Sequence, residues 1–346
     1  MSETSVDKLN EVKKQLNILF NDNIKENILI HYWEILPKRK VLLDWIDISK
    51  LNWKRLSCNS YAIDLLYKNR YKINWGKLSG NKNAIKLLRN HIYESALTLI
   101  DLDILPLTLL QNNRYKINWS NLSKNSNAIE LLKENQEKIN WDNLSRNVNG
   151  IELLTENQDK INWDNLSGNI NGIELLKNNQ DKIDWSNLSG NINGINLLKE
   201  NLDKIEWDIL SFNRNGIELL KENPEKIDWI NLSANENGIE LLKENLGKIN
   251  WNNLSYNKNG IKLLVCNKME INWKFLSFNK NANVIELLKE RINYEKSCDS
   301  DKQINWDYLS ENENAIELLK ENLDKINWIN ISNNISIFKD ECMPPL

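Results

Sequence analysis

The chain has few of the residues that build reactive or cross-linked sites. Its 346 residues include two histidines, His31 and His91, and four cysteines. The cysteines lie far apart and form no CxxC pair: Cys58, Cys266, Cys298 and Cys342. This spacing encodes neither a disulfide framework nor a zinc site, and two histidines are too few for a His-based metal centre. We therefore expect reduced thiols, no bound metal and no cofactor.

Long apolar runs and leader features are also missing. No stretch approaches the roughly 18 apolar residues that a membrane-spanning helix needs. Residues 1–8 lack the basic start and apolar stretch of a secretory signal. A charged fraction of 27% is ordinary for a soluble protein. We therefore expect an intracellular, non-secreted protein that does not bind membranes.

What the sequence does contain is a 22-residue unit built around Ile-Asn-Trp-x-x-Leu-Ser-x-Asn-x-Asn. Repetition at this period indicates a stacked array, so one domain is a better estimate than the two that the length suggests. The tryptophans set the register, with one skipped slot at Leu97 and a longer gap before Trp306. They are Trp53, Trp75, Trp119, Trp141, Trp163, Trp185, Trp207, Trp229, Trp251, Trp273, Trp306 and Trp328.

The unit at Trp185 illustrates the predicted local structure. Asp184 is placed to cap a short helix over 185–189, whose Trp and Leu share one face. Asn191 is expected to end this helix in a left-handed conformation, and Asn193 to cap a second helix over 194–200. Helices this short are marginal alone, so stacking must hold them. We predict that the Trp and Leu residues form the core, and that the recurring Asn and Ser satisfy helix ends or form hydrogen-bond ladders between units.

These features predict an all-α fold, an α-solenoid of about a dozen 22-residue repeats with two short helices each. A leucine-rich-repeat-like solenoid is the alternative, because its period is similar and Leu-Ser-x-Asn resembles its strand-to-loop corner. That pattern needs apolar residues two before the Leu and two after the Asn, where this chain has polar residues such as Asp142 and Asn149. The helical interpretation is therefore favoured.

The repeat register also suggests boundaries. Residues 1–50 lie outside it but have helical apolar spacing, and are predicted to form an N-terminal helical cap. Residues 51–338 are the solenoid, with a degenerate unit near 97–118 and an insertion near 283–302 that should bulge outward. Residues 339–346, which include two prolines, are predicted to be a disordered tail.

The tandem units carry a family resemblance. Residues 160–167 (KINWDNLS), followed by 171–176 (NGIELL), resemble short Trp- and Asn-containing tandem repeats in uncharacterised proteins of giant amoeba-infecting DNA viruses. The resemblance covers about residues 51 to 338 and departs from the pattern at 91–106 and 297–302. It implies a viral protein that acts on host or virion partners in the host cytoplasm or the virion, and it implies no enzymatic activity.

No catalytic constellation stands out, so we expect no enzyme and assign no catalytic residue. Acidic residues such as Glu152 and Glu174 recur once per unit, as structural or surface positions do. Two positions in the turn between the predicted helices vary, and turns on a repeat scaffold often carry recognition. The leading hypothesis is a non-catalytic scaffold that binds an unknown protein partner through an extended solenoid surface. The candidate partner-binding residues are Lys124, Arg146, Phe212, Arg214, Tyr256, Lys258, Phe278, Lys280 and Glu311.

The alternative function is a nucleic-acid-binding repeat protein that uses its basic end. Between Lys38 and Arg89 the chain has 13 Lys or Arg against three acids, although the whole chain has a net charge of −3. Tyrosines interleave with these cations, as in a platform for stacking bases. The candidate polyanion-binding residues are Lys54, Arg55, Lys68, Arg70 and Lys72.

Overall fold

The computed structural model describes residues 38–98, 117–297 and 303–342. In these ranges the chain is mostly short helices that recur at the period of the sequence repeat, which confirms the all-α solenoid. The described repeat units contain no strand, so the leucine-rich-repeat alternative is wrong. A short 3-10 helix, such as η8 (Leu202–Lys204), follows the second helix in most described units and was not predicted.

The first helix of each unit starts at the tryptophan and is called here the Trp helix. The Asn or Asp before the Trp accepts a hydrogen bond from a backbone N–H of the first turn; Asp184, for example, accepts from Asn187 N at 2.7 Å, as predicted. The described Trp helices are α3 (Trp53–Leu56), α5 (Trp75–Leu78), α8 (Trp119–Lys124), α10 (Trp141–Ser145), α12 (Trp163–Ser167), α14 (Trp185–Gly190), α16 (Trp207–Phe212), α18 (Trp229–Ala234), α20 (Trp251–Tyr256), α22 (Trp273–Leu276), α24 (Trp306–Glu311) and α26 (Trp328–Ile331).

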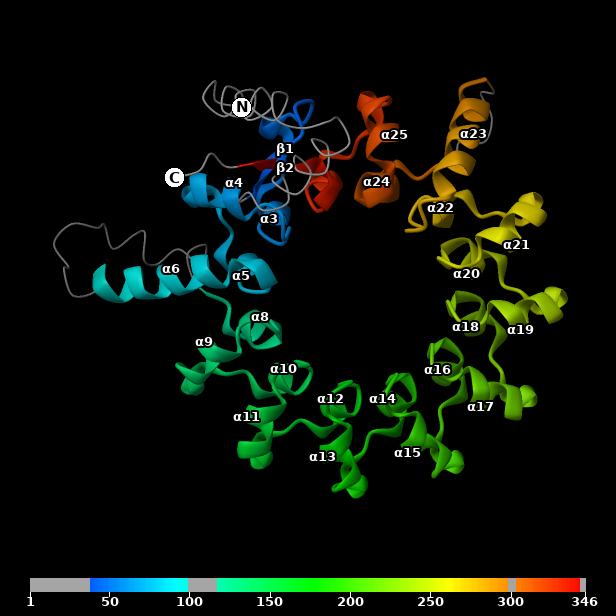
Figure 1. Cartoon of the computed structure of the whole chain (residues 1–346), viewed down its shortest axis with the longest axis horizontal. Coiled ribbons are helices and arrows are strands. Elements are labelled where there is room, and N and C mark those ends of the chain that lie inside the picture. Colours follow the sequence, from blue (N-terminus) through cyan, green and yellow to red (C-terminus); the bar gives the residue numbers. More distant parts are fainter. Residues whose placement is uncertain (1–37, 99–116, 298–302, 343–346) are drawn as a thin grey trace, which may run out of the picture.

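The second helix of each unit lies farther from the centre of the molecule and is called here the outer helix (Figure 1). Two outer helices, α6 and α23, are longer than the others because they extend into the departures from the repeat. The described outer helices are α4 (Ile63–Lys68), α6 (Ile85–Thr98), α9 (Ile129–Lys133), α11 (Ile151–Glu156), α13 (Ile173–Lys177), α15 (Ile195–Lys199), α17 (Ile217–Glu222), α19 (Ile239–Glu244), α21 (Ile261–Cys266), α23 (Val284–Ser297) and α25 (Ile316–Lys320).

Two details of the predicted capping are wrong. Asn191 follows the Trp helix with φ −78° and ψ 116°, which is extended backbone and not the left-handed conformation. The N-cap of the outer helix α15 is Gly194, which makes no side-chain cap hydrogen bond. The side chain of Asn193 instead reaches Ile170 O in the preceding unit, at 2.8 Å. These asparagines therefore join units rather than cap the outer helix.

The stack of units closes into a ring, with the Trp helices on its inner side (Figure 1). Strand β1 (Lys38–Leu42) pairs antiparallel with β2 (Phe338–Cys342), so residues from the two ends of the described chain form one two-stranded sheet. At this joint Asn52 N donates to Ser332 Oγ at 2.8 Å. Asn74 N donates to Ser57 Oγ at 3.0 Å in the same way between two consecutive units. The first and last Trp units are therefore neighbours in the ring.

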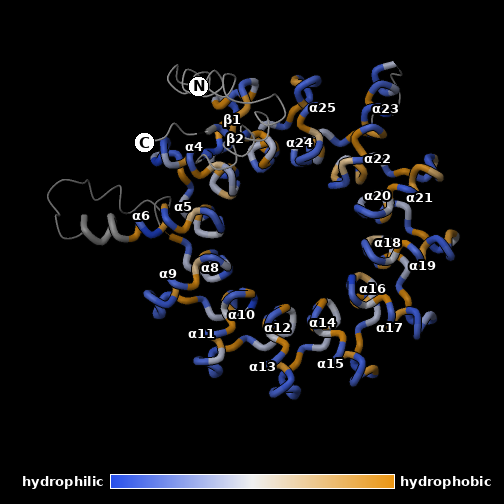
Figure 2. Tube along the Cα trace, viewed as in Figure 1, coloured by the Kyte–Doolittle hydropathy of each residue, from blue (hydrophilic) through white to orange (hydrophobic). Residues whose placement is uncertain are grey.

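The buried side chains of successive units form one hydrophobic cluster, and apolar segments recur in each unit around the ring (Figure 2). In the unit at Trp185, Leu188 and Leu198 are fully buried, and Leu197 and Ile205 are nearly so. Burial of each such side chain contributes about 1.5 to 3 kcal/mol, and short helices depend on this term because they are marginal on their own. Each unit shares its apolar face with both neighbours, so stability comes from stacking.

The two terminal boundaries differ from the prediction. Of the N-terminal region 1–50, residues 1–37 lie outside the described residues, and 38–42 form a strand instead of part of a helical cap. Residues 338–342 form the strand that pairs with it, so the predicted tail 339–346 is ordered as far as Cys342. Sequence periodicity gave no signal for this pairing because the two segments are about 300 residues apart.

The units on either side of the degenerate unit near 97–118 stack directly on each other. Residues 99–116 lie outside the described residues, but Asn125 Nδ2 donates to Ser79 O at 3.2 Å and to Asn81 O at 3.0 Å. These are the contacts of directly stacked units, so the unit at Trp119 follows the unit at Trp75 without an intervening one. At the insertion near 283–302, whose residues 298–302 lie outside the described ranges, α23 extends outward. Asn312 Nδ2 donates directly to Ser277 O and Asn279 O, so the units at Trp273 and Trp306 also stack on each other.

Candidate interaction surfaces

A ladder of buried asparagine side chains runs through the described units. Asn191 Nδ2 donates to Ser167 O at 2.9 Å and to Asn169 O at 3.0 Å in the preceding unit. Its Oδ1 accepts from Asn193 N at 3.0 Å. Because a buried carbonyl without a partner costs free energy, this side chain specifies how two units dock.

The same ladder crosses the joint of the ring. Asn59 Nδ2 donates to Ser332 O and to Asn334 O, both at 3.1 Å. Those donor and acceptor positions are equivalent to the ones used between consecutive units. The hydrogen-bond ladder between units, expected from the sequence, is thus confirmed and continues around the ring.

Serine joins neighbouring units in a second way. Ser189 Oγ donates to Trp185 O at 2.8 Å and accepts from Glu206 N, in the next unit, at 3.0 Å. The described part of the chain contains no buried side-chain nitrogen or oxygen without a hydrogen-bond partner. The repeated polar residues are therefore occupied by assembly of the ring, and recognition must use other positions.

The tryptophans are not the buried core that the spacing predicted. Among the described residues only Trp75 is buried, and its ring stacks on His91 with the centroids 3.6 Å apart. The others are half-buried, and a cation from the following 3-10 segment covers many of them. Lys204 Nζ, for example, lies 4.6 Å from the Trp185 ring centroid. Equivalent pairs are Lys72 with Trp53, Lys138 with Trp119, Lys160 with Trp141, Lys182 with Trp163, and Lys248 with Trp229.

The Trp of each of those pairs is the first residue of its Trp helix. Because the Trp helices are seen nearly end-on in Figure 1, their first residues lie toward one face and their last residues toward the other. The face toward which the last residues of the Trp helices lie is called here the turn face. It consists of the residue after each Ser, together with the turn that precedes the outer helix.

The cation over each indole contributes about 0.5 to 1 kcal/mol to stability at an exposed site. This contact explains how a half-buried tryptophan still serves stability.

The predicted partner-binding residues all lie on the turn face, spread over successive units. Phe212 is 56% exposed and Tyr256 is 46% exposed, which is unusual for large aromatic side chains. Phe278 and Glu311 are half-buried, and the remaining seven are exposed. Cations and acids on this face form ion pairs between units, such as Arg214 with Glu236 at 2.9 Å.

Three aromatic rings from neighbouring units form a cluster that the sequence did not reveal as such. The Tyr256 and Phe278 rings stack with centroids 5.6 Å apart and planes 12° from parallel. Tyr308 meets the edge of Phe278 at 5.5 Å. Tyr308 is two residues after its Trp, a position occupied by Asn in many units, so sequence comparison of units would have marked it as an exception. The cluster is an apolar strip across three consecutive units.

A hollow of about 220 Å³ adjoins this strip. Its apolar lining comes from Ala234, Tyr256 and Phe278, and its charged lining from Glu236, Lys258 and Lys280. Four of the predicted partner-binding positions therefore converge here: Tyr256, Lys258, Phe278 and Lys280. Lys124 and Arg146 are on other units and are not among its lining residues.

The predicted polyanion-binding residues are divided by the structure. Lys54 and Arg55 lie on the Trp helix α3, whereas Lys68, Arg70 and Lys72 lie at the end of α4 and in the 3-10 segment after it. Lys72 covers Trp53 with its Nζ 4.5 Å from the ring centroid, and the Arg70 guanidinium lies 4.6 Å from the Tyr67 ring centroid. Two of the five cations, Lys72 and Arg70, thus contact aromatic side chains of the protein itself.

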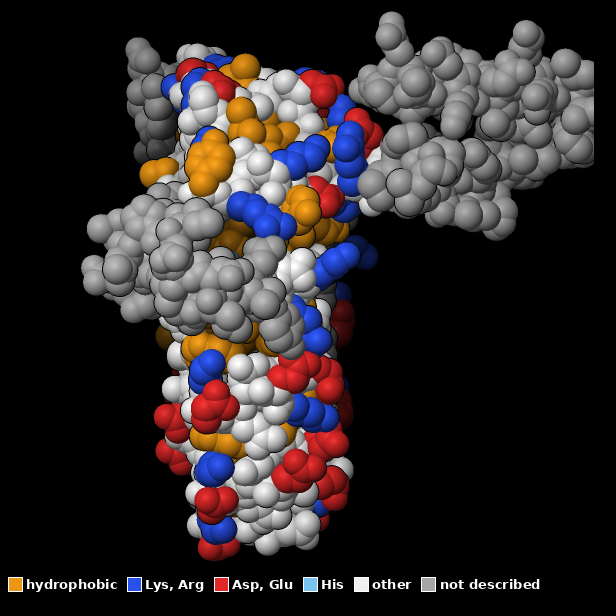
Figure 3. Space-filling view, turned by 90° about the vertical axis from the view of Figure 1, so that its left-hand side faces the viewer, with side chains coloured by type: hydrophobic (Ala, Val, Ile, Leu, Met, Phe, Trp, Pro, Cys, Tyr) orange, Lys and Arg blue, Asp and Glu red, His pale blue; other side chains and the backbone are white. Residues whose placement is uncertain are grey.

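Other cations of the basic segment are paired with acids from distant parts of the chain. Arg39 pairs with Glu341, and Lys40 Nζ lies 2.7 Å from Asp340 Oδ1. Figure 3 shows the outer side of this part of the ring, where Lys and Arg side chains gather in the upper half and acidic side chains join them below. The local excess of positive charge that the sequence shows is therefore partly neutralised by β2.

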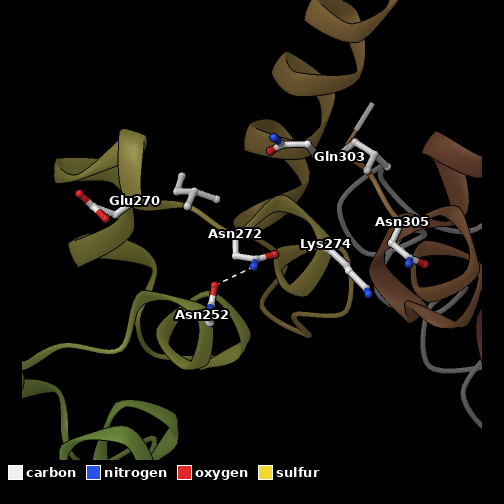
Figure 4. Close-up of a pocket in the computed structure, with 8 residues that line it drawn as sticks. Asn252, Glu270, Asn272, Lys274, Gln303 and Asn305 are labelled. Atoms are coloured by element: carbon white, nitrogen blue, oxygen red, sulfur yellow. Dashed lines mark hydrogen bonds between the residues drawn. The ribbon is translucent and has the colours of Figure 1, made fainter. Parts of the chain in front are cut away.

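A wider and more polar hollow, of about 530 Å³, lies where the insertion leaves the stack. Its lining comes from Asn252, from the segment 270–274 and from residues 303–305, which follow the insertion. Asn272 Nδ2 donates to Asn252 Oδ1 at 2.7 Å, and Glu270 points away from the other labelled side chains (Figure 4). The labelled lining residues are Asn252, Glu270, Asn272, Lys274, Gln303 and Asn305.

The ion pairs of Lys133 and Lys221 lie at the surface of the outer helices, whereas Arg291 and Glu295 of α23 form a largely buried pair. The Glu152 carboxylate raises the pKa of Lys133 by accepting a hydrogen bond, and Glu218 raises the pKa of Lys221 in the same way. In the part of the chain that the structure describes, no three His, Cys, Asp or Glu residues are grouped so as to hold a metal ion. No described helix is long and apolar enough to cross a membrane.

Comparison of the chain with protein-family models, with curated proteins and with solved structures gives no match.

Proposed function

We propose that the protein is a non-catalytic, ring-shaped scaffold that binds a protein partner on its turn face. The observation that carries this proposal is the division of labour between positions. The repeated Asn and Ser side chains are used to join units, whereas the variable positions of the turn face place large aromatic side chains in solvent. Exposed aromatic residues clustered beside cations are typical of the centre of a protein interface.

Binding of nucleic acid through the basic segment is less well supported. A polyanion site needs cations in a continuous line along the backbone of the ligand. The five predicted cations lie on two different elements of the unit, and Lys72 and Arg70 are held against aromatic rings. We therefore propose protein binding as the function. We also propose that it takes place inside cells, as expected from the sequence. The resemblance to viral repeat proteins makes host and virion proteins the first partners to test.

Site-specific photo-crosslinking in the source cells tests the proposal. A photoreactive phenylalanine analogue replaces Phe212 or Tyr256 on the turn face, one at a time. Matched control variants carry it at Leu202 or Leu246, which are 47% and 49% exposed in the 3-10 segments of the outer side. We expect turn-face positions to cross-link to a protein in a nuclease-insensitive product, and the outer positions to give none.

Equal cross-linking from both sets of positions would mean that the partner does not recognise the turn face. Cross-linked products that contain nucleic acid and no protein would contradict the scaffold proposal and support the nucleic-acid-binding function instead.

A further inference from the structure

We infer that the hollow beside Tyr256 and Phe278 binds an acidic segment of the partner and receives one of its large apolar side chains. This inference rests on the proposed function and adds the location and chemistry of the contact. The hollow of about 220 Å³ is lined on one side by Ala234, Tyr256 and Phe278. A volume of this size beside two stacked aromatic rings suits a single side chain of a bound segment, as in peptide-binding grooves that take an anchor residue.

The charge around the hollow selects an acidic partner. Lys258 and Lys280 are exposed and line it, and their ammonium groups are carried on flexible stems. Glu236 is the one acid in its lining, and Arg214 of the preceding unit already pairs with that carboxylate at 2.9 Å. Lys280 lies 3.8 Å from Glu313, a long and exposed pair that an incoming carboxylate can replace at little cost. The hollow therefore offers apolar side chains beside two lysines, Lys258 and the loosely paired Lys280.

The arrangement of the aromatic side chains favours a peptide over single-stranded nucleic acid as the ligand of this hollow. A stacking platform for bases needs aromatic faces that are free on the side of the ligand. Here the Tyr256 and Phe278 rings stack on each other at 5.6 Å, and the Phe278 ring is also met by Tyr308. The rings form a joined surface for packing an aliphatic or aromatic side chain, with no gap between them for a base.

Units farther along the ring show that this aromatic site is local. The residues equivalent to Tyr256 and Phe278 are Gly168 and Gly190 in the units at Trp163 and Trp185. Those units carry the same ladder of Asn and Ser contacts but no aromatic ring at this position. The ring thus has one aromatic arc on the turn face and another arc without it, and we assign the anchor site to the first.

A displayed random-peptide library, panned on the immobilised full chain, tests the inference. The same library is panned in parallel on a Tyr256→Ser/Phe278→Ser double variant, and circular dichroism checks that this variant is folded. We expect enriched peptides to carry an aromatic residue or leucine next to Asp or Glu. Synthetic labelled copies of these peptides should bind about tenfold or more weakly to the double variant, as truncation of anchor contacts does.

Two further variants separate charge from general surface effects. Lys258→Glu with Lys280→Glu should weaken binding of the acidic peptides, and the affinity for the unaltered chain should fall with rising salt. Leu202→Ser with Leu246→Ser, which removes equally exposed apolar side chains elsewhere, should leave their affinity unchanged. A labelled oligothymidine should bind no more tightly to the unaltered chain than to the double variant.

Enrichment of basic or uncharged peptides, no enrichment at all, or peptides that bind the double variant equally well would overturn the inference. Oligothymidine binding that depends on Tyr256 would also overturn it, in favour of nucleic acid. If turn-face cross-linking to a protein succeeds while the double variant keeps full affinity for the peptides, the scaffold function stands and only this anchor site is lost.

Discussion

Removal of one rung of the asparagine ladder tests how the ring is held together. Asn191 is 1% exposed, and its side chain makes three hydrogen bonds: two donated to Ser167 O and Asn169 O, and one accepted from Asn193 N. Asn191→Ala removes all three and leaves two buried carbonyls with one partner fewer. At about 1 kcal/mol net for each hydrogen bond, and more where a buried group is left unsatisfied, the loss in free energy of unfolding should be about 3 to 5 kcal/mol.

Two companion variants make the test specific. Asn193→Ala removes one exposed side-chain bond, to Ile170 O, and should cost about 0.5 to 1 kcal/mol. Asn191→Asp keeps the acceptor but places an oxygen against two carbonyl oxygens, so at neutral pH it should destabilise more than Ala. The folded-state pKa of that buried carboxyl would be raised, so the folded state binds the proton more tightly than the unfolded state. Stability of the Asp variant should then increase as the pH falls through this raised pKa.

Urea titration followed by circular dichroism measures these differences, provided that the slope of the transition is unchanged. A loss below about 1 kcal/mol for Asn191→Ala, or equal losses for the Asn191 and Asn193 variants, would show that the buried ladder does not hold the units together. A pH-independent Asp variant would contradict the assigned direction of the Nδ2 donations.

Three other predictions concern the tryptophan contacts and the closure of the ring. Lys204→Ala should lower the free energy of unfolding by about 0.5 to 1 kcal/mol, because it removes the cation over the Trp185 ring; urea titration measures the loss, and no loss would mean that the contact is not formed in solution. Truncation of residues 338–346 should expose the Asn52 amide to hydrogen exchange, since it opens the joint where that amide bonds to Ser332, while amides in the units far from the joint stay protected. Deletion of residues 185–206, one whole unit, should preserve the helical circular-dichroism spectrum. It should also weaken the protection of the Asn52 amide from hydrogen exchange, because a ring with one unit fewer must bend more at every interface. Unchanged protection would show that ring closure is insensitive to the number of units.

The repeat, its helices and its ladders followed from the sequence because they are local or repeat at a fixed period. The Trp helix at Trp185 has the predicted N-cap, Asp184. This cap was predictable because the side-chain acceptor and the backbone N–H of Asn187 that it binds lie only three residues apart in the sequence. The recurrence of Asn and Ser at fixed positions indicated contacts between units, and Asn191 makes them.

Ring closure was not predictable in the same way. It depends on the curvature per unit, which accumulates from small rotations that no single residue type determines. The pairing of β1 with β2 joins segments without repeat periodicity, and its ion pair between Lys40 and Asp340 has no local signal. The burial of tryptophan was misjudged because spacing shows that Trp185 and Leu188 share a side of a helix, and does not show that the indole lies at its margin, beneath Lys204.

The candidate surface was predicted only in part. Variation at the positions after Ser indicated Tyr256 and Phe278, but their stacking, and the participation of Tyr308, depend on the lateral distance between Trp helices. The basic segment looked like one site in a linear count of charges. The structure places Lys54 and Lys68 on different elements and brings acids from β2 to this region.

Because the contacts at the joint repeat those between consecutive units, the ring has no unit that must come first. Linking Cys342 to Lys38 and cutting the chain in an exposed turn, for example between α15 and α16, would give a circular permutant with the same set of interfaces. Such rearrangements are tolerated when the new ends lie at the surface. The order in which the units are synthesised would then differ from the order in the natural chain, while their arrangement in the ring stays the same. Any interface between neighbouring units could therefore be the last to form when the ring closes.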